Sequence, residues 1–376
     1  MNILALEPYY GGSHRAFLDG WIAAGRHRWT LLTLPAHKWK WRMRHAAVTF
    51  AAETHDRLAR SEKWDLLFCS DMLNLAEFKG LAPPHVANLP AVSYFHENQL
   101  TYPVRFQNER DYQFAVTNMT TALAADAVWF NSDFHRSEFL DALSAFLKKM
   151  PDHQPTESIE QIRRKSEIHP PGVPPIEPAP KPTDAPLHIL WAARWEHDKN
   201  PEAFFDALGR LKKHQVDFRI SAIGEQFRNS PPCFDKARTE FADRIVHWGY
   251  QPGRTEYENA LTSADVFVST ANHEFFGIGA VEAMLAGAYP LLPDRLAYPE
   301  ILATDRCLWS RQHLYDGTPD QLARRLSQLA ARKTAGSLWP NDPACIQELV
   351  ARFRWDKLAP PMDDALQKIA ARIEPQ

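Results

Sequence analysis

HPPGVPPIEPAPKPTDAP, the stretch from His169 to Pro186, divides this chain into two parts. Proline fixes φ and lacks the amide donor, so a segment this rich in proline can form neither a helix nor a central strand. We interpret it as an extended linker. The chain has 376 residues, of which 45% are hydrophobic, so a core can form on either side. The sequence therefore predicts domains at 1–170 and 187–352, joined by a linker at 171–186.

Short apolar runs alternate with helical sequence on both sides of the linker. Ile3 to Leu6 is followed by a glycine-containing turn at Tyr9 to Ser13, and then by apolar residues at helical spacing up to Gly25. Ser132 follows a later run as a helix N-cap. The remaining strands are predicted at 65–69, 91–95 and 127–131 before the linker, and at 187–192, 218–223, 244–248, 265–269 and 288–292 after it.

This alternation is typical of parallel sheets covered by helices. The predicted fold class is therefore α/β, with two doubly wound Rossmann-like domains. In such sheets ligands bind at the carboxyl ends of the strands, and two domains facing across a cleft suit an extended ligand.

The composition is that of an ordinary globular protein. The formal net charge is −3, so a polyanion such as RNA would have to bind a local basic patch. No stretch approaches the ~20 apolar residues of a membrane span, and the start, MNILALEPYY, lacks a secretory signal pattern. The four cysteines form no CxxC pair, which argues against a disulfide framework and a zinc cluster. We expect a cytoplasmic protein without a metal site, membrane contact or evident obligate protein partner.

The strongest chemical signal is HEFFGIGAVEAMLAG, residues 273–287, which follows an apolar strand. A helix should begin near Gly277. The amides of Phe276, Gly277 and Ile278 would then lie at its N-terminus, where unpaired N–H groups and the helix dipole favour a phosphate.

Two carboxylates, Glu274 and Glu282, lie in the same segment with seven residues between them. A fully helical interval would span ~12 Å, so they suit the two ends of a long ligand. Carboxylate oxygens accept from vicinal hydroxyls, so Glu282 fits a ribose diol and Glu274 a hexose hydroxyl. The alternative is a buried helix with solvated glutamates.

A second signal is ARWEHDKNP, residues 193–201, directly after a predicted strand. It places Arg194 and Lys199 at the carboxyl end of that strand. A planar guanidinium and a compact ammonium together suit the two phosphates of a diphosphate leaving group. In isolation, such a pair is more often a solvated surface.

Two weaker features precede the linker. Gly11 and Gly12 lack a Cβ, which would permit close approach of the backbone to a ligand, although a plain tight turn explains them equally well. His96 follows the strand predicted at 91–95, where its side chain can reach a ligand, although a lone histidine is more often structural.

The clearest nucleic-acid feature is HKWKWRMRH, residues 37–45. Lysines and arginines can neutralise phosphates while indole rings stack on unpaired bases. The alternative is an exposed basic helix whose tryptophans pack on the first domain. The candidate RNA contacts are Lys38, Trp39, Lys40, Trp41, Arg42 and Arg44.

These signals together resemble the GT4-type retaining glycosyltransferases of GT-B fold, which carry an Arg and a Lys after one strand and a Glu-x7-Glu motif after a later one. More narrowly, the chain resembles the tRNA-queuosine mannosyltransferase family along nearly its whole length. The resemblance is carried by EPYYGGSHRAF (7–17), LPAHKWKWRMR (34–44), LLFCSDMLNLAEF (66–78), YFHENQLTYPVR (94–105), NSDFHRSEFL (131–140) and RWEHDKNPEAFF (194–205).

The resemblance implies that mannose passes from GDP-mannose to the cyclopentenediol of queuosine, at the wobble position of an aspartate tRNA. Arg194 and Lys199 would hold the diphosphate, Glu282 the ribose and Glu274 the sugar. His96 would face the reacting side of the sugar, and the loop of Gly11 and Gly12 would close over the donor. No metal, cofactor or protein nucleophile would be required. The ending FRWDKLAPPMDDALQKI implies that 353–376 forms a helix crossing back to the first domain.

Two alternatives stay open at this stage. One keeps the donor and mechanism but glycosylates a lipid or polysaccharide precursor, for which an amphipathic basic helix with exposed leucine or phenylalanine would be expected. The other is a non-catalytic RNA-binding relative, in which some of the motif residues should be missing. Here the basic segment is rich in tryptophan, and all the motif residues are present.

Overall fold

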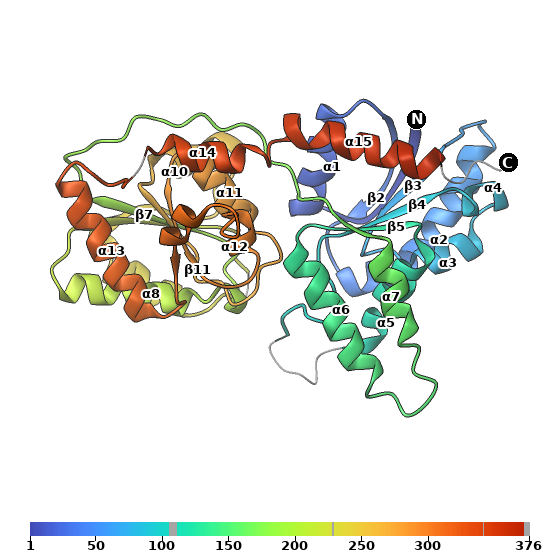
Figure 1. Ribbon diagram of the computed structural model, residues 1–376, viewed down its shortest axis with the longest axis horizontal. Coiled ribbons are helices and arrows are strands. Elements are labelled where there is room, and N and C mark those ends of the chain that lie inside the picture. Colours follow the sequence, from blue (N-terminus) through green and yellow to red (C-terminus); the bar gives the residue numbers. More distant parts are fainter. Residues whose placement is uncertain (105–110, 228, 341, 372–376) are drawn as a thin grey trace. The chain divides into compact units, whose positions relative to one another are not determined.

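A computed structural model of the chain describes residues 1–104, 111–227, 229–340 and 342–371 (Figure 1). Arg105 of the motif quoted above and residues 372–376 of the expected C-terminal helix lie outside the described residues. The chain divides into two compact units: unit 1 is Met1–Gly172 together with Trp355–Gln376, and unit 2 is Val173–Arg354. Within the described ranges, none of the helices has the length and apolar character that crossing a bilayer requires.

Unit 1 is built on a parallel sheet of six strands in the order β2-β1-β3-β4-β5-β6. The strands are β1 (Asn2–Tyr10), β2 (Arg28–Pro35), β3 (Leu66–Ser70), β4 (Ala91–Phe95), β5 (Ala127–Phe130) and β6 (Ser166–Ile168). The helices are α1 (Gly12–Ala24), α2 (Trp39–Leu58), α3 (Leu75–Leu81), α4 (Pro84–Ala87), α5 (Tyr112–Ala124), α6 (Asp133–Leu147), α7 (Glu157–Arg164) and α15 (Trp355–Ala371).

Unit 2 has a second parallel sheet in the order β12-β11-β10-β7-β8-β9. Its strands are β7 (Leu187–Ala192), β8 (Phe218–Ile223), β9 (Ile245–Gly249), β10 (Val266–Val268), β11 (Tyr289–Pro293) and β12 (Leu314–Tyr315). Its α-helices are α8 (Pro201–Lys213), α9 (Cys233–Glu240), α10 (Arg254–Ser263), α11 (Ile278–Leu285), α12 (Tyr298–Ile301), α13 (Pro319–Thr334) and α14 (Ala344–Ala351), and the 3₁₀ turns are η2 (His197–Lys199), η3 (Ala242–Arg244) and η4 (Leu308–His313).

The sequence predicted most of these elements. Every predicted strand is present, and Ser132 caps α6 by accepting a hydrogen bond from the amide of His135 at 3.0 Å. The turn predicted from Tyr9 was placed too early, because β1 continues to Tyr10. The strands that the sequence did not predict, β2, β6 and β12, all lie at sheet edges, where strands are short or less regularly apolar.

The proline-rich stretch has no helix, and from Val173 onward it belongs to unit 2. Val173 forms an isolated parallel bridge with Arg354. Further along, the ammonium of Lys181 donates to the backbone oxygen of Gly287 at 2.6 Å. These contacts place the boundary between the units at Gly172 and Val173.

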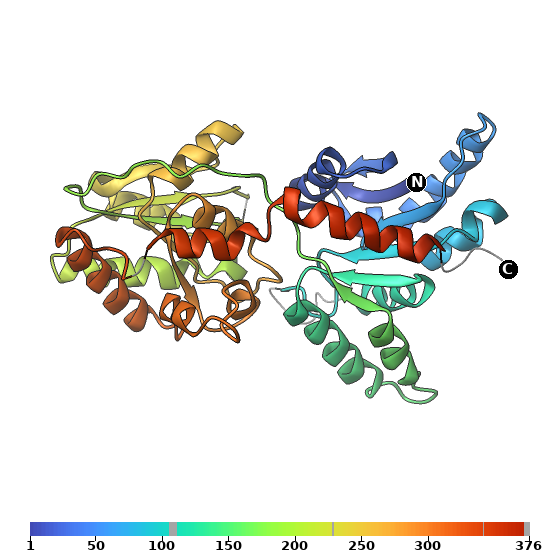
Figure 2. The ribbon, with the colours of Figure 1, turned by 45° about the horizontal axis from the view of Figure 1, so that its top comes forward.

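Helices cover both faces of the sheet of unit 1. One face packs on α1 and α15, which lie side by side in Figures 1 and 2, and its core includes Phe17, Trp21 and Trp355. The opposite face packs on α2, α3, α5, α6 and α7. The last helix of the chain therefore completes the core of the first unit.

The junction between α1 and α15 requires glycine at two positions. A Cβ on Gly20 would lie 2.1 Å from the indole nitrogen of Trp355, and one on Gly172 would lie 2.2 Å from the same ring. Farther along α15, the buried carboxylate of Asp363 accepts from the indole N–H of Trp21 at 2.9 Å and from the amide of Arg26 at 2.7 Å. These contacts fix the position of α15 on unit 1.

We predict that Asp363→Ala lowers the free energy of unfolding by about 2 kcal/mol or more, because it leaves two buried donors without an acceptor. Asp364→Ala is the matched control, because Asp364 is exposed and pairs only with Arg26 at the surface. Urea denaturation of both variants measures the difference. Equal losses of stability would contradict the assigned role of Asp363.

Candidate functional site

A pocket lies at the carboxyl edge of the sheet of unit 2. The chain leaves β7 toward β8 on one side and returns to β10 on the other, so the strand order reverses between β7 and β10. Ligands of doubly wound sheets bind at such a reversal. The pocket is lined from both strands and from the loop before α11, by residues that include Ala193, Lys199, Ser269, Glu274, Gly277 and Tyr298.

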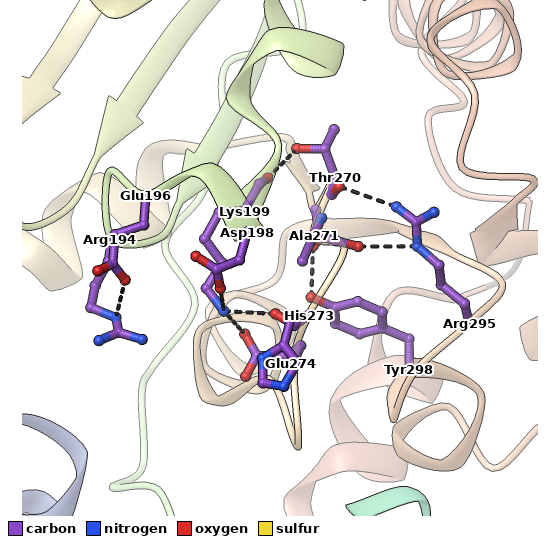
Figure 3. Close-up of polar contacts among 11 residues, drawn as sticks. Arg194, Glu196, Asp198, Lys199, Thr270, Ala271, His273, Glu274, Arg295 and Tyr298 are labelled. Atoms are coloured by element: carbon purple, nitrogen blue, oxygen red, sulfur yellow. Dashed lines mark hydrogen bonds and ion pairs between the residues drawn. The ribbon is translucent and has the colours of Figure 1, made fainter. Parts of the chain in front are cut away.

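Lys199 is the central charge of this pocket (Figure 3). It ends the turn η2, and its ammonium lies 2.8 Å from the backbone oxygen of His273, 3.3 Å from Glu274 Oε2 and 3.1 Å from Asp198 Oδ2. Only 7% of the residue is exposed. Burial alone would lower the pKa of Lys199, but Glu274 and Asp198 raise it above its usual value, so the side chain is a cation at neutral pH.

Arg194 differs from Lys199 in its surroundings. Its guanidinium is about half exposed and lies 3.4 Å from the carboxylate of Glu196, and Figure 3 shows this pair apart from the ammonium of Lys199. The two predicted cations follow β7, as expected. Lys199 lies in a buried ion-pair network, whereas Arg194 is partly exposed.

The predicted helix start is confirmed. Gly277 is the N-cap of α11 and has φ of 102°, a left-handed conformation that favours glycine. A Cβ at Gly277 would also lie 3.0 Å from the ring of Tyr298. Phe276 packs edge-on against Phe353, which fixes the chain just before Ile278, the first residue of the helix. The use of these amides to bind a phosphate stays a prediction.

The loop before α11 is held from several sides. The hydroxyl of Tyr298 lies 2.6 Å from Ser269 Oγ, and Arg295 donates to the backbone oxygen of Ala271 at 3.0 Å (Figure 3). Thr270 donates to the backbone oxygen of Lys199 at 2.8 Å. The loop and the turn η2 therefore form one hydrogen-bonded framework around the pocket.

Glu282 is a buried carboxylate with two protein partners. Arg254 donates to Oε1 at 2.8 Å, and the hydroxyl of Tyr257 donates to Oε2 at 2.8 Å. Its side chain is 8% exposed, so the alternative of two solvated glutamates is wrong for this residue. Burial and then Glu282 raise the pKa of Tyr257 well above its usual range, so Tyr257 stays a donor.

The predicted residues of unit 1 gather at the carboxyl edge of its own sheet. Gly11 is the N-cap of α1, and a Cβ there would lie 2.4 Å from that of Ala36, so close packing explains this glycine. Gly12 has φ of 51°, in the left-handed region. His96 directly follows β4, and its ring lies 4.0 Å from that of His14. Closure of the glycine loop over a ligand stays a prediction.

The basic segment forms the loop after β2 and the first two turns of α2, and its lysines and tryptophans differ in exposure. Lys38, Lys40 and Trp41 are exposed, with Trp41 at 62%. Trp39 instead packs inward on Phe114, its ring centroid 5.1 Å from that of its neighbour.

The two arginines of the segment are also engaged within the protein. Arg42 donates to the backbone oxygen of Pro35 at 3.1 Å. Arg44 lies over the ring of Phe114 at 4.7 Å and 3.7 Å from the carboxylate of Asp111. Three of the six predicted RNA contacts therefore have a structural role in unit 1.

Comparison with known proteins identifies the family. Residues 2–173 match the family model described as tRNA-queuosine alpha-mannosyltransferase N-terminal, and residues 176–335 match Glycosyl transferases group 1. A tRNA-queuosine alpha-mannosyltransferase of Drosophila melanogaster is 37% identical over 337 residues, which cover 86% of either chain. This chain belongs to the tRNA-queuosine α-mannosyltransferase family. It is therefore a glycosyltransferase, as the resemblance implied.

Further relatives share parts of the chain or the fold. A GDP-mannose:cellobiosyl-diphosphopolyprenol alpha-mannosyltransferase of Xanthomonas oryzae is 30% identical over 108 residues, or 28% of either chain. Sucrose-phosphate synthase from Thermosynechococcus elongatus superimposes with a TM-score of 0.70 at 15% identity, covering 99% of this chain and 100% of its own. A glycosyltransferase from Rickettsia africae gives 0.67 at 14%, covering 98% of each. These likenesses show the GT-B fold that the sequence predicted.

Sequence reasoning missed several residues at the site of this family member. Asp198 lies inside the quoted ARWEHDKNP segment, but nothing in its spacing indicated that it would pair with Lys199. Arg254 and Tyr257 are three positions apart on α10, and that spacing on one helix face is the signal that could have drawn attention to them. Tyr298 follows β11 after a short loop, so its position at a carboxyl strand end was the available signal.

We predict that the two cations differ in their effect on stability. Lys199→Ala should lower the free energy of unfolding by about 2–3 kcal/mol, because it leaves Asp198 and Glu274 without their buried counter-ion. Arg194→Ala, at an exposed position, should change it by less than about 0.5 kcal/mol. Urea denaturation of both variants checks this. A Lys199 variant as stable as wild type would show that the network does not depend on its charge.

Proposed function

We propose that this chain transfers mannose from GDP-mannose to the cyclopentenediol of queuosine, at the wobble position of an aspartate tRNA, with retention of configuration. The observation that carries the proposal is the match to the Drosophila tRNA-queuosine alpha-mannosyltransferase along 86% of both chains. The Xanthomonas relative, whose name gives GDP-mannose as its donor, supports the same donor here.

Unit 2 would bind the donor. The ammonium of Lys199 and the guanidinium of Arg194 would bind the diphosphate, together with the amides at the start of α11. Glu282 would accept hydrogen bonds from the ribose hydroxyls, held in position by Arg254 and Tyr257. Glu274 would accept from a hydroxyl of the sugar.

The proposed chemistry needs no protein nucleophile and no metal. As the bond between the anomeric carbon and the phosphate oxygen breaks, negative charge grows on the diphosphate, and Lys199 and Arg194 stabilise it. The acceptor hydroxyl attacks from the face that the diphosphate leaves, and its proton passes to a phosphate oxygen. Because GDP-mannose has an α-linked sugar, an α-mannoside product keeps that configuration.

Unit 1 would supply the acceptor side. His96 would contact the sugar, and the exposed residues Lys38, Lys40 and Trp41 would contact the anticodon loop. The basic segment is connected to His96 within this unit. Trp39 and Tyr9 pack in one cluster, the ring of Tyr9 lies 5.9 Å from that of His14, and the ring of His14 lies 4.0 Å from that of His96. That proximity supports one acceptor site at the carboxyl edge of the sheet.

Incubation with GDP-mannose and tRNA, with or without queuosine, followed by nucleoside mass spectrometry, tests the function. A hexose added only to queuosine supports it. Transfer from UDP-glucose but not GDP-mannose, or transfer only to a polyprenyl diphosphate sugar, overturns it. Activity should persist in EDTA, and abolition by EDTA with rescue by magnesium or manganese would contradict the metal-free mechanism.

We predict that Arg194→Ala lowers turnover by about 10²-fold, because the guanidinium stabilises charge that develops as the diphosphate leaves. Because Arg194 is exposed, the substitution should leave folding intact, and the measured change then reports turnover alone. Single-turnover kinetics at saturating donor measure the effect. A folded variant with unchanged turnover would place Arg194 outside the reaction site.

We predict that Lys38→Asn combined with Lys40→Gln weakens tRNA binding and flattens its salt dependence. Each lost phosphate contact removes ~0.7–0.9 from the log-log slope. The matched control is Lys148→Gln with Lys149→Gln, which removes the same charge from exposed positions after α6. Binding measured between low and high salt should change only in the first variant. Equal changes in both would mean that the effect is one of net charge.

A further inference from the structure

A buried ion pair lies at the carboxyl edge of the sheet of unit 1, outside the contacts assigned above. His14 Nδ1 lies 3.2 Å from Glu7 Oε2, and the two residues are 6% and 2% exposed. The other oxygen of Glu7 accepts from the amide of Tyr9 at 2.8 Å and from the hydroxyl of Ser70 at 3.0 Å. Glu7 is therefore fixed by groups of β1 and β3, and in turn it fixes the ring of His14.

The ring of His14 packs at a tilt against that of His96. Their centroids are 4.0 Å apart and the planes differ by 32°. Tyr94 and Phe17 pack against His96 at 4.6 Å and 5.1 Å, the latter edge to face. The imidazole of His96 therefore lies between the ring of His14, which pairs with Glu7, and the rings of Tyr94 and Phe17.

The backbone of His96 is held as firmly as its ring. Its amide donates to Asp71 Oδ1 at 2.9 Å, and its carbonyl accepts from the side chain of Asn131 at 2.9 Å. Since Asp71 follows β3 and Asn131 follows β5, both neighbouring strands fix the residue that follows β4.

Three carboxylates, Glu7, Asp71 and Glu97, act on the charge of His14. Burial would lower the pKa of His14, but Glu7 above all, and then Asp71 and Glu97, raise it to about 9. Burial, followed by the charge of His14, holds the pKa of His96 well below its usual range. The titratable groups that face the pair are Glu7 on β1, Asp71 after β3, Tyr94 on β4, Glu97 after β4 and His135 on α6.

A shared metal ion does not fit this arrangement. Glu7, His14 and His96 do place one ligand atom each within 4.8 Å of one another. The Nδ1 of His14, however, is already hydrogen-bonded to Glu7. The carboxylate of Glu7 also already accepts from Tyr9, Ser70 and His14.

We propose that His14 is a positioning residue for His96: an imidazolium, paired with Glu7, whose neighbouring charge adds to burial in keeping His96 neutral and whose ring orients that of His96. The inference rests on the proposed function, in which His96 contacts the sugar. As the glycosidic bond breaks, positive charge develops on the sugar ring, and a protonated His96 would repel it. A neutral imidazole can donate to one hydroxyl and accept from another without that repulsion.

The test compares His14→Gln, which removes the charge but can still donate to Glu7, with His14→Lys, which keeps a charge. Imidazole titrations by NMR on histidine-labelled protein, assigned with a His96→Gln variant, follow His96 without any substrate. In His14→Gln the titration midpoint of His96 should rise by about one pH unit or more, and in His14→Lys it should stay near the wild-type value.

The pH dependence of turnover should follow the same pattern. The acid limb of the rate profile should move to higher pH in His14→Gln and not in His14→Lys, whereas binding of GDP to the variants should be unchanged. An unaltered His96 midpoint in His14→Gln overturns the proposal, as does a neutral His14 at pH 7 in the wild type or equal midpoints in the two variants. Because the NMR titration needs no mannose transfer, its result is independent of whether the proposed reaction is correct.

Discussion

The buried ammonium of Lys199 is the interaction on which the pocket of unit 2 depends. It joins the turn after β7 to the loop after β10 through Asp198, Glu274 and the backbone oxygen of His273. Those two segments follow the strands between which the sheet order reverses. The ammonium at this position is paired with two carboxylates before any ligand binds, so a diphosphate bound there as proposed would compete with groups that already hold the charge in place. Preorganisation of this kind avoids reorientation of the charge during the reaction.

The same principle organises unit 1 with different residues. Its sheet reverses between β1 and β3, and there the buried charges are the carboxylate of Glu7 and the imidazolium of His14. In unit 2, Lys199 is held by Asp198, and in unit 1, His96 is held by His14. Lys199 and His96 are proposed to contact the substrate, whereas Asp198 and His14 need not touch it. Mutations at those neighbours would alter the protonation or orientation of the contact residue, and their effects should not be mistaken for lost substrate contacts.

The sequence predicted the fold well because apolar runs bounded by turn residues are local signals. The start of α11 at Gly277 was predictable for the same reason, since only a residue that tolerates positive φ suits that turn. The pairing of Lys199 with Asp198 and Glu274 was not predictable, because rotamers and loop geometry decide which of several acids a lysine reaches. The packing of His14 against His96 depends on the register of β1 relative to β3 and β4, which one sequence does not contain. Likewise, Trp39 and Trp41 look equivalent in the sequence, but the helical rotation of α2 turns one inward and the other to solvent.

The packing of α15 on α1 has a consequence for biosynthesis. Trp21 and Asp363 form a hydrogen bond across 342 positions of sequence, and all of unit 2 lies between them. A ribosome therefore releases the strands and most helices of unit 1 long before the helix that covers one face of their sheet. During that interval the indole N–H of Trp21 lacks its acceptor and Phe17 lacks its contact with Trp355, whereas unit 2 can complete its own core from contiguous sequence. The order of completion in the cell is thus the reverse of the order of synthesis, and the nascent first unit is the state most exposed to aggregation or chaperone binding.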